Sequence, residues 1–345
     1  MLGGLFVNFI FGVMFFYFLP FWGITPKTIL FLNIFVFGVF SLFWRVVFYY
    51  LFSIKFLRKV SILGEGKNIE ILKREIKEKE FLGFKLVSLD EEPDLIIFTK
   101  EKERDPQFLA LMDNFLVRGV DFLDLETAFE QILEKVPVTE ISKAWFLKNL
   151  KEGGKKIYDK VKRIFDLVFS FLILIFTLWF WPFIALAIKI EDGGPIFYLQ
   201  ERVGKNGKIF KLIKFRSMIP EAEKIGPKWT DIQDKRITKI GKFLRKFHLD
   251  EIPQMINILK GDISLVGPRP EAIENVKQFE KQIPHYNLRH IIKPGFTGWA
   301  QIKFKYARSV EESLEKFQYD LYYIKNRSLF LDLKILLKTL QLFFK

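Results

Sequence analysis

The chain opens with two long apolar runs, Met1 to Trp22 and Thr28 to Phe56. Each approaches or exceeds the roughly 20 residues that a helix needs to cross a bilayer. The connection between them carries only Lys27, whereas three basic residues gather at the end of the second run: Lys55, Arg58 and Lys59. Because positive charge is retained on the cytoplasmic side, the pattern predicts a transmembrane hairpin over residues 1–58 with both ends in the cytoplasm.

A third apolar segment, from about Ile164 to Ile190, is also long enough to span, but basic residues lie on both of its flanks. Positive charge on both sides indicates that both ends face the cytoplasm. Pro182 supplies a break, because it has no N–H to donate to the carbonyl of Leu178. The pattern therefore predicts a re-entrant helix, which enters the membrane and leaves by the same face. An ordinary kinked transmembrane helix is the alternative.

Between these segments, residues 59–140 alternate short apolar strands with polar-faced helices. Strands are predicted at Val60–Leu63, Lys85–Leu89, Leu95–Thr99 and Val120–Leu123, and helices at Ile69–Lys77 and Phe108–Val117. This order predicts a small Rossmann-like domain with a parallel sheet. Its turn Gly64-Glu65-Gly66 has two glycines of the G-x-G-x-x-G fingerprint, but Ile69 occupies the third place. A structural or regulatory domain without a dinucleotide is the favoured interpretation.

The composition supports a membrane protein. Half of the 345 residues are apolar, and the formal net charge is +14. The basic residues lie beside apolar segments, where anionic headgroups are nearer partners than nucleic acid. We therefore expect membrane lipids as partners and no nucleic acid. The lack of Cys excludes disulfides and thiolate metal sites.

The most informative stretch is Arg245 to Pro270, RKFHLDEIPQMINILKGDISLVGPRP. Its carboxylate pair, Asp250 and Glu251, directly precedes Pro253, which marks a helix start, and Gly261 marks the stop. The pair is thus expected at the positive end of a helix, where phosphate is the favoured ligand. Two carboxylates beside an anion site make sense if one holds a divalent cation and the other attacks phosphorus. An isolated acidic pair is more often a solvated surface feature, so the interpretation depends on the surrounding motifs.

Those motifs occur in a fixed order from about Lys155 to the C-terminus. They are KRIFDLVFS (Lys162 to Ser170), the segment with Pro182, DGGPIFYLQERVGKNGKIF (Asp192 to Phe210), KFRSM (Lys214 to Met218), DKRITKIGKFLRKFHLDEIPQ (Asp234 to Gln254), VGPRPE (Val266 to Glu271) and KPGFTGWAQI (Lys293 to Ile302). Together they resemble the bacterial sugar transferase family, the monotopic polyprenyl-phosphate phosphoglycosyl transferases.

The resemblance implies an α/β membrane enzyme of the bacterial inner membrane. Its catalytic domain, residues 161–345, would follow a linker at 141–160 and face the cytoplasm, with a re-entrant helix at about 164–190. Such an enzyme transfers a sugar phosphate from a UDP-sugar to undecaprenyl phosphate and releases UMP, and UDP-glucose or UDP-galactose is typical of the longer members. Asp250 would be the nucleophile that forms a phosphosugar aspartate, and Glu251 would hold Mg²⁺.

Four basic residues are candidates for binding the substrate's phosphates. Arg245 and Arg269 are expected to be phosphate clamps, because a guanidinium group binds two phosphate oxygens at once. Lys214 and Arg216 alternate with the apolar Phe215, which on a strand would send both charges to one face. We expect that face to border the nucleotide-sugar site.

Two residues depart from the family pattern. Trp181 stands where many members have Ser before Pro182, and His248 stands where Ser or Thr usually precedes Leu-Asp-Glu. Leu329 to Phe344 has spacing suited to an interfacial helix, or to a helix packed on the domain. A non-catalytic, membrane-anchored scaffold is the alternative function, and the middle domain is a candidate contact for a homodimer.

Overall fold

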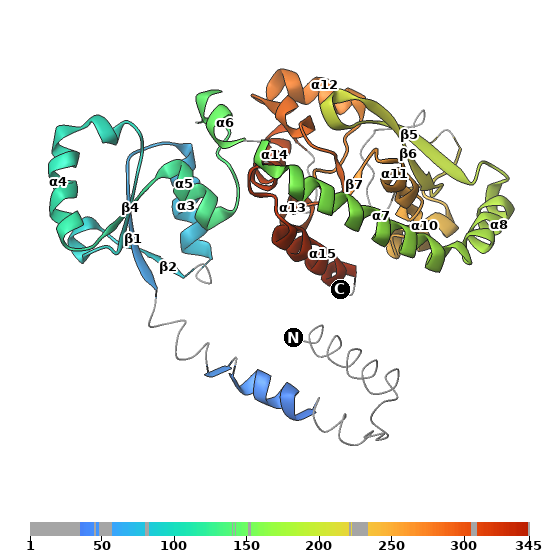
Figure 1. Cartoon of the computed structure of the whole chain (residues 1–345), viewed down its shortest axis with the longest axis horizontal. Helices are drawn as coiled ribbons and strands as arrows, with labels where there is room; N and C mark the ends of the chain where they lie inside the picture. Colours follow the sequence, from blue (N-terminus) through green and yellow to red (C-terminus); the bar gives the residue numbers. More distant parts are fainter. Residues whose placement is uncertain are drawn as a thin grey trace. The chain divides into compact units, whose positions relative to one another are not determined.

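The computed structural model describes residues 35–44, 46–47, 57–79, 83–139, 141, 143–150, 153–220, 222, 234–304 and 309–343. Contacts divide the chain into two units, Met1–Ala128 and Phe129–Lys345 (Figure 1). The first run of the predicted N-terminal hairpin lies outside the described residues. Of the second run, the structure describes a short apolar helix, Phe35–Trp44, so the hairpin stays a prediction.

The first unit contains the predicted parallel sheet. Its strands are β1 (Arg58–Leu63), β2 (Phe84–Leu86), β3 (Leu95–Phe98) and β4 (Asp121–Asp124), in the order β2-β1-β3-β4. All three pairings are parallel. The helices are α3 (Lys67–Glu78), α4 (Pro106–Val117) and the start of α5 (Leu125–Leu133), with short 3₁₀ turns η3 (Leu89–Glu91) and η4 (Lys102–Arg104). Figure 1 shows α3 and α4 on opposite sides of the sheet. The parallel sheet predicted from the sequence is confirmed.

The Gly64-Glu65-Gly66 turn between β1 and α3 is filled by the protein's own side chains. Gly64 has φ 123°, and a Cβ at this position would lie 2.8 Å from the methyl group of Thr99 and 3.2 Å from Cδ1 of Ile69. Ile69, which occupies the third glycine's place, is buried. Packing therefore gives a sufficient reason for the first glycine.

The second unit is built from helices around two small sheets. β5 (Phe197–Val203) and β6 (Ile209–Phe215) form an antiparallel hairpin, and β7 (Ser264–Val266) pairs in parallel with β8 (Gly295–Thr297). The helices are α6 (Lys143–Asn149), α7 (Lys156–Leu178), α8 (Trp181–Asp192), α10 (Lys239–Lys246), α11 (Gln254–Lys260), α12 (Ile273–Gln282), α13 (Trp299–Lys303), α14 (Val310–Asn326) and α15 (Leu329–Phe343), with 3₁₀ turns η5 (Gly153–Lys155), η6 (Lys205–Gly207), η7 (Leu249–Glu251) and η8 (Tyr286–His290).

The hydrophobic core of this unit joins distant parts of the sequence. Trp299, Phe317 and Tyr323 are among its fully buried large side chains. Ile141 and Phe146, from the segment expected to be a linker, pack into the same core. Residues from Val136 onward therefore contribute to the stability of the second unit.

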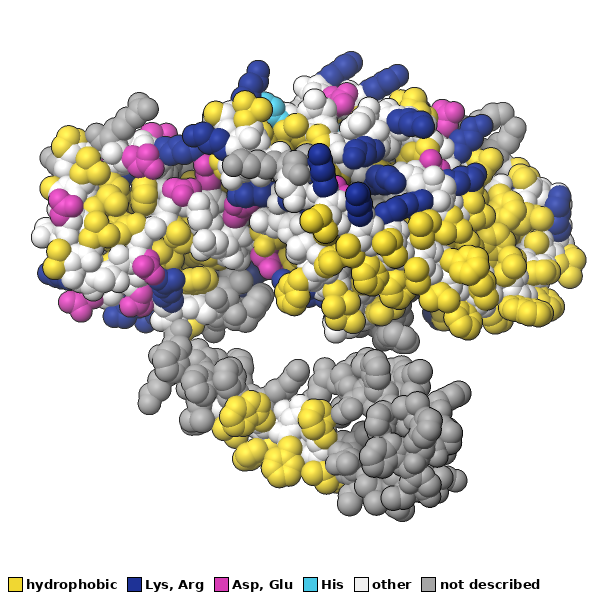
Figure 2. All heavy atoms as spheres, in the orientation of Figure 1, with side chains coloured by type: hydrophobic (Ala, Val, Ile, Leu, Met, Phe, Trp, Pro, Cys, Tyr) yellow, Lys and Arg dark blue, Asp and Glu magenta, His cyan; other side chains and the backbone are white. Residues whose placement is uncertain are grey.

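α7 and α8 form the bent pair expected for the third apolar segment. The two helices meet at 61°, and Pro182 lies in the first turn of α8, directly after the break. Within the described residues, no single helix is both long and apolar enough to cross a membrane, whereas this bent pair passes the same test. Figure 2 shows hydrophobic side chains gathered over α7 and α8, beside a row of Lys and Arg. Phe176, Trp179 and Phe183 are among the exposed ones.

Trp181, at the break, packs against the β5–β6 hairpin. Its ring lies 5.1 Å from that of Phe215 and 5.9 Å from that of Phe197. The Trp181 ring, in place of Ser, thus packs the bend between α7 and α8 against the hairpin that carries Lys214.

The N-terminal half of α7 is attached to α11 and β7, the two elements that follow the carboxylate pair in the sequence. Arg163 donates to the carbonyls of Ile258 and Leu259, at the end of α11, at 2.6 and 2.8 Å. The buried Asp166 accepts from the Ser264 hydroxyl at 3.0 Å and the Leu265 N–H at 2.9 Å, both in β7. The apolar helix and the site described below are therefore parts of one packed structure.

Candidate active site

The carboxylate pair lies in a tight turn before a short helix, as the sequence predicted. Asp250 and Glu251 form η7, Pro253 precedes α11, and Gly261 ends that helix with φ 89°. Because α11 has only seven residues, its dipole is a smaller source of anion affinity than the sequence analysis supposed. The charges around the pair have to supply most of it.

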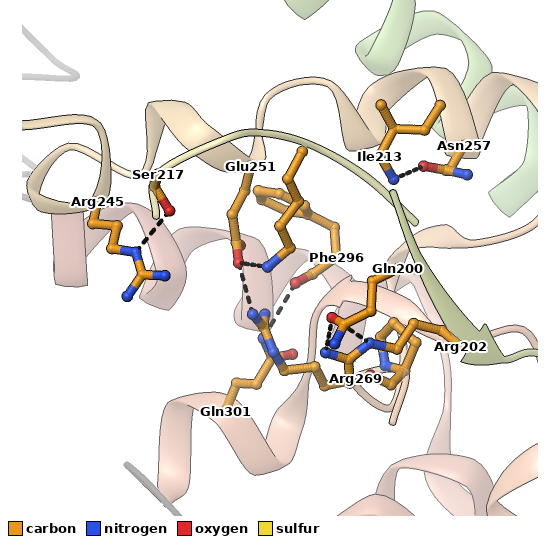
Figure 3. Close-up of polar contacts among 12 residues, drawn as sticks. Gln200, Arg202, Ile213, Ser217, Arg245, Glu251, Asn257, Arg269, Phe296 and Gln301 are labelled. Carbon is orange, nitrogen blue, oxygen red and sulfur yellow. Dashed lines mark hydrogen bonds and ion pairs between the residues drawn. The ribbon is translucent and has the colours of Figure 1, made fainter. Parts of the chain in front are cut away.

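Glu251 joins two of the predicted phosphate-binding residues. Its Oε1 accepts from Nζ of Lys214 at 2.8 Å and from Nη2 of Arg269 at 2.7 Å (Figure 3). The Lys214 and Glu251 side chains are largely buried, whereas that of Arg269 is 36% exposed. The three residues come from β6, η7 and the loop after β7, so the fold assembles them from distant segments.

The ion pairs fix the charge of Glu251. Burial would raise the pKa of its carboxyl, but the Arg269 guanidinium and the Lys214 ammonium outweigh burial and hold that pKa well below its usual range. The Glu251 carboxylate in turn raises the pKa of Arg269. Burial lowers the pKa of Lys214, although Glu251 opposes that change.

Asp250 is in the opposite situation. It is only 7% exposed. Burial, and then the neighbouring Glu251 carboxylate, raise the pKa of Asp250, while Lys214, Arg245 and His248 oppose the rise. Two adjacent carboxyls whose pKa values move apart are typical of a site that gives them different chemical roles.

Arg245 faces the same region from α10. Its Nε donates to Oγ of Ser217 at 2.8 Å (Figure 3). Thr238 caps α10 by accepting from the Gly241 N–H at 2.9 Å. A Cβ at Gly241 would lie 2.0 Å from the Ser217 carbonyl oxygen, so only glycine lets α10 approach this closely. Burial lowers the pKa of Arg245, with Asp250 the largest opposing charge.

Arg216 takes a different partner from Lys214. It lies just beyond the end of β6 and forms a buried ion pair with Asp192, at the end of α8. A Cβ at Gly194 would lie 1.7 Å from Nη1 of Arg216, so the glycine leaves room for the guanidinium. Lys214 and Arg216 therefore have different ion-pair partners, and the expectation that both border the nucleotide-sugar site stays a prediction.

The Pro268-Arg269-Pro270-Glu271 segment is held by its backbone. Each of its four carbonyls accepts a hydrogen bond from another element: Pro268 from the Gly295 N–H at 2.8 Å, Arg269 from Nη2 of Arg289 at 3.0 Å, Pro270 from Nη1 of Arg202 at 3.2 Å, and Glu271 from the Val203 N–H at 3.1 Å. The prolines restrict the backbone, and these bonds fix where it lies, so Arg269 starts from a rigid base.

Three residues that support this segment were not among the predicted site residues. Arg289 is buried and also donates to Oδ2 of the buried Asp320 at 2.8 Å. Arg202 donates to Oε1 of Gln200 and to the Pro270 carbonyl. The sequence alone could have indicated that Asp320 is buried and paired, because it is an acidic residue inside the largely aromatic and apolar run FQYDLYYI.

His248, one of the two departures, adopts a left-handed conformation with φ 53°. It makes no side-chain cap to η7, so it does not replace the hydroxyl cap that a Ser or Thr would supply. Few non-glycine residues adopt this conformation, and here it sets the direction in which the chain enters Asp250.

The carboxylates fit a magnesium ion held partly by substrate. Within the described residues, no group of three or more His, Cys, Asp or Glu could hold a metal ion. Mg²⁺ is commonly bound by only one or two carboxylates together with phosphate oxygens and water. Lys214 and Arg269 both bind Oε1 of Glu251, and neither of these bonds uses Oε2. The pair Asp250 and Glu251 therefore fits that mode of binding.

Most of the second unit matches the model of a known protein family. The family model described as bacterial sugar transferase matches residues 157–345, more than half of the chain, and the chain belongs to this family.

Three relatives show the range of similarity. A UDP-N-acetylgalactosamine-undecaprenyl-phosphate N-acetylgalactosaminephosphotransferase of Aeromonas hydrophila is 47% identical over 157 residues, which cover 46% of this chain and 37% of the relative. A UDP-glucose:undecaprenyl-phosphate glucose-1-phosphate transferase of Escherichia coli is 43% identical over 52% of this chain and 39% of the relative. One of the same description from Xanthomonas campestris is 35% identical over 69% and 50%. The chain thus spans half or less of these relatives.

Proposed function

We propose that this chain transfers a sugar phosphate from a UDP-sugar to undecaprenyl phosphate and releases UMP. The observation that supports this most directly is a buried carboxylate, Asp250, beside a second carboxylate that two cations keep ionised. The three relatives are named as transferases that act on a UDP-sugar and undecaprenyl phosphate, and this supports the same reaction class.

In the proposed reaction, Asp250 acts as the nucleophile. An oxygen of its carboxylate forms a bond to the sugar-proximal phosphorus, the bond from that phosphorus to the bridging oxygen breaks, and UMP leaves with the electron pair. An oxygen of undecaprenyl phosphate then attacks the same phosphorus, and the Asp250 carboxylate leaves. The products are UMP and undecaprenyl diphosphate sugar.

The surrounding cations make this attack feasible. A carboxylate approaching a diphosphate meets strong repulsion unless positive charge lies nearby. Arg269 is partly exposed and held on a fixed backbone, and Arg245 lies near Asp250, so both are suited to bind phosphate oxygens. Lys214 keeps Glu251 ionised and oriented. Mg²⁺, held by Glu251, would supply further charge neutralisation when bound.

The bent helix pair is proposed to enter the cytoplasmic leaflet of the bacterial inner membrane and return. Its exposed apolar side chains need a hydrocarbon environment, and the lysines and arginines beside them suit an anionic headgroup layer. This arrangement would place Asp250 on the cytoplasmic side, where UDP-sugars are found. A homodimer formed through the Rossmann-like unit stays a prediction.

The donor is proposed to be UDP-glucose or UDP-galactose, and the names of the relatives add UDP-N-acetylgalactosamine to the donors worth testing. The test is to incubate the full chain in detergent with Mg²⁺, undecaprenyl phosphate and each UDP-sugar in turn, and to identify the nucleotide released. UMP from one donor supports the proposal. UDP would mean that the sugar moves without its phosphate, and release of neither nucleotide would favour a non-catalytic scaffold.

A further inference from the structure

Three lysines surround one buried tryptophan at the C-terminal end of the chain. Trp299 is fully buried at the start of α13. The Nζ atoms of Lys303, Lys334 and Lys338 lie 4.9, 4.8 and 5.5 Å from the centre of its ring. Each distance is within the range of a cation–π contact, so the indole face partly stabilises the ammonium groups. We call these three residues the lysine cluster.

The carboxylate of Glu134 forms ion pairs with two of the three lysines. Glu134 pairs with Lys303 at 2.5 Å and with Lys334 at 2.9 Å. It is fixed in place, because its carbonyl accepts from Nε1 of Trp299 at 3.0 Å and its backbone adopts the left-handed φ of 54°. Lys338 has no carboxylate partner among the residues that the structure describes. The described cluster therefore carries three positive charges against one negative charge.

The excess charge is accessible and unfavourable without an anion. The side chains of Lys303 and Lys334 are 29% and 36% exposed. Burial, followed by the charges of Lys303 and Lys334, lowers the pKa of Lys338. If the cluster served only to pack α13 against α15, Glu134 and one lysine would suffice, and a third ammonium group would add repulsion.

The cluster borders an apolar surface on the same helix. Phe330, Leu333, Leu337 and Leu340 of α15 are 79%, 54%, 50% and 54% exposed. Lys334 and Lys338 each follow one of these leucines directly in sequence, so on a helix they flank the apolar stripe. A stripe of exposed leucines beside lysines is the pattern of a helix at a lipid interface, with ammonium groups at headgroup depth.

We propose that the lysine cluster binds the phosphate of an anionic phospholipid headgroup, while the leucines of α15 contact its acyl chains. The phosphate adds a second negative charge beside that of Glu134 and so reduces the excess positive charge of the cluster. The proposal does not depend on the transferase activity, because it uses residues of α13 and α15 that take no part in the carboxylate site.

The helix that carries two of the three lysines is linked to the carboxylate site through the β7–β8 strand pair. Thr339 of α15 shares a hydrogen bond of 2.7 Å with Thr297 of β8. β8 pairs with β7, and the chain leaving β7 carries Arg269. A lipid held at α15 therefore fixes the helix that supports this strand pair.

Native mass spectrometry of the full chain, released from detergent micelles, tests the proposal. The micelles contain phosphatidylglycerol and phosphatidylcholine with identical acyl chains in equal amounts. We expect the wild type to retain phosphatidylglycerol preferentially. Lys338→Gln should reduce the preference about fivefold, since one lysine near a membrane surface contributes about that factor, and Lys334→Gln with Lys338→Gln should reduce it further. The single variant keeps both Glu134 ion pairs, so it tests the site without disturbing them.

The matched control is Lys277→Gln with Lys281→Gln. Lys277 and Lys281 are exposed on α12 and are four positions apart, like Lys334 and Lys338. The two substitutions remove the same charge as the double cluster variant. The proposal is overturned if this control lowers the preference as much as the cluster variants, or if Lys338→Gln leaves it unchanged. Displacement of the lipid by millimolar inorganic phosphate would also contradict it, because that result would indicate a site for free phosphate.

Discussion

Glu251 and Arg269 lie 18 positions apart in the sequence, and their side chains meet at 2.7 Å, Nη2 to Oε1. The contact joins the segment around Asp250 to the Pro-Arg-Pro motif. Lys214, from β6, donates to the same oxygen of Glu251. The two cations hold the pKa of Glu251 below its usual range, whereas burial and the Glu251 carboxylate raise the pKa of Asp250.

Glu251→Gln should cost both stability and activity. The substitution leaves Lys214 and Arg269 without their shared carboxylate, and removing one partner from a buried ion pair costs about 3 kcal/mol or more of unfolding free energy. We expect a lower thermal midpoint in detergent and a fall in UMP release of about 100-fold. Glu201→Gln, the same change at an exposed position of β5, should leave both unchanged. Normal stability and activity in Glu251→Gln would contradict the role given to these ion pairs.

The acid limb of the pH profile should report Asp250. Its pKa is raised from the ordinary 3.8, and the nucleophile must be ionised, so activity should be lost as pH falls through that raised pKa. Lys214 opposes the rise, and Lys214→Gln should therefore move the acid limb to higher pH. The residual UMP release of this variant, measured across pH, checks the direction. A limb that moves to lower pH, or stays in place, would show that another group controls it.

Arg289 should act by positioning Arg269. Arg289→Lys keeps the charge but loses the fork that joins Asp320 to the Arg269 carbonyl, so we expect KM for the UDP-sugar to rise about tenfold with a smaller change in kcat. The double variant with Arg269→Lys should be no worse than Arg269→Lys alone, because both changes affect one interaction with substrate. Fully additive losses would indicate a merely structural role for Arg289.

Gly194→Ala tests the buried pair of Arg216 and Asp192. The added methyl group would occupy the position of the Arg216 guanidinium, so the thermal midpoint should fall by several degrees. Gly154→Ala is the control, because a Cβ there meets nothing within 4 Å. If the two variants have equal midpoints, Arg216 is not held as the structure shows.

Local patterns predicted the elements that depend on neighbouring residues. Pro253 and Gly261 gave the bounds of α11 to within a residue, and Pro182 gave the bend between α7 and α8. Alternating apolar segments gave the parallel sheet. These features follow from proline's missing N–H, glycine's freedom at positive φ and the periodicity of buried side chains, all of which can be read over a few positions.

Such local patterns did not predict hydrogen bonds and ion pairs between residues that are far apart in the sequence. Lys214 and Glu251 are 37 positions apart, and Arg289 reaches the Arg269 carbonyl across 20. Strand alternation related Lys214 to Arg216, but it did not indicate that Arg216 lies beyond the end of β6 and pairs with Asp192. A side chain's partner depends on tertiary packing, which the spacing of residues in one strand does not contain.

The central claim, that Asp250 carries the phosphosugar, is tested most directly by labelling the enzyme without acceptor. The full chain is incubated with Mg²⁺ and a UDP-sugar labelled with ³²P at the sugar-proximal phosphate, then digested and examined by mass spectrometry. The account predicts label on the peptide that contains Asp250, one UMP released per labelled chain, loss of label when undecaprenyl phosphate is added, and no label in Asp250→Asn. A wild-type enzyme that releases UMP only when acceptor is present and never becomes labelled would contradict it, because the phosphate would then pass directly between the two substrates.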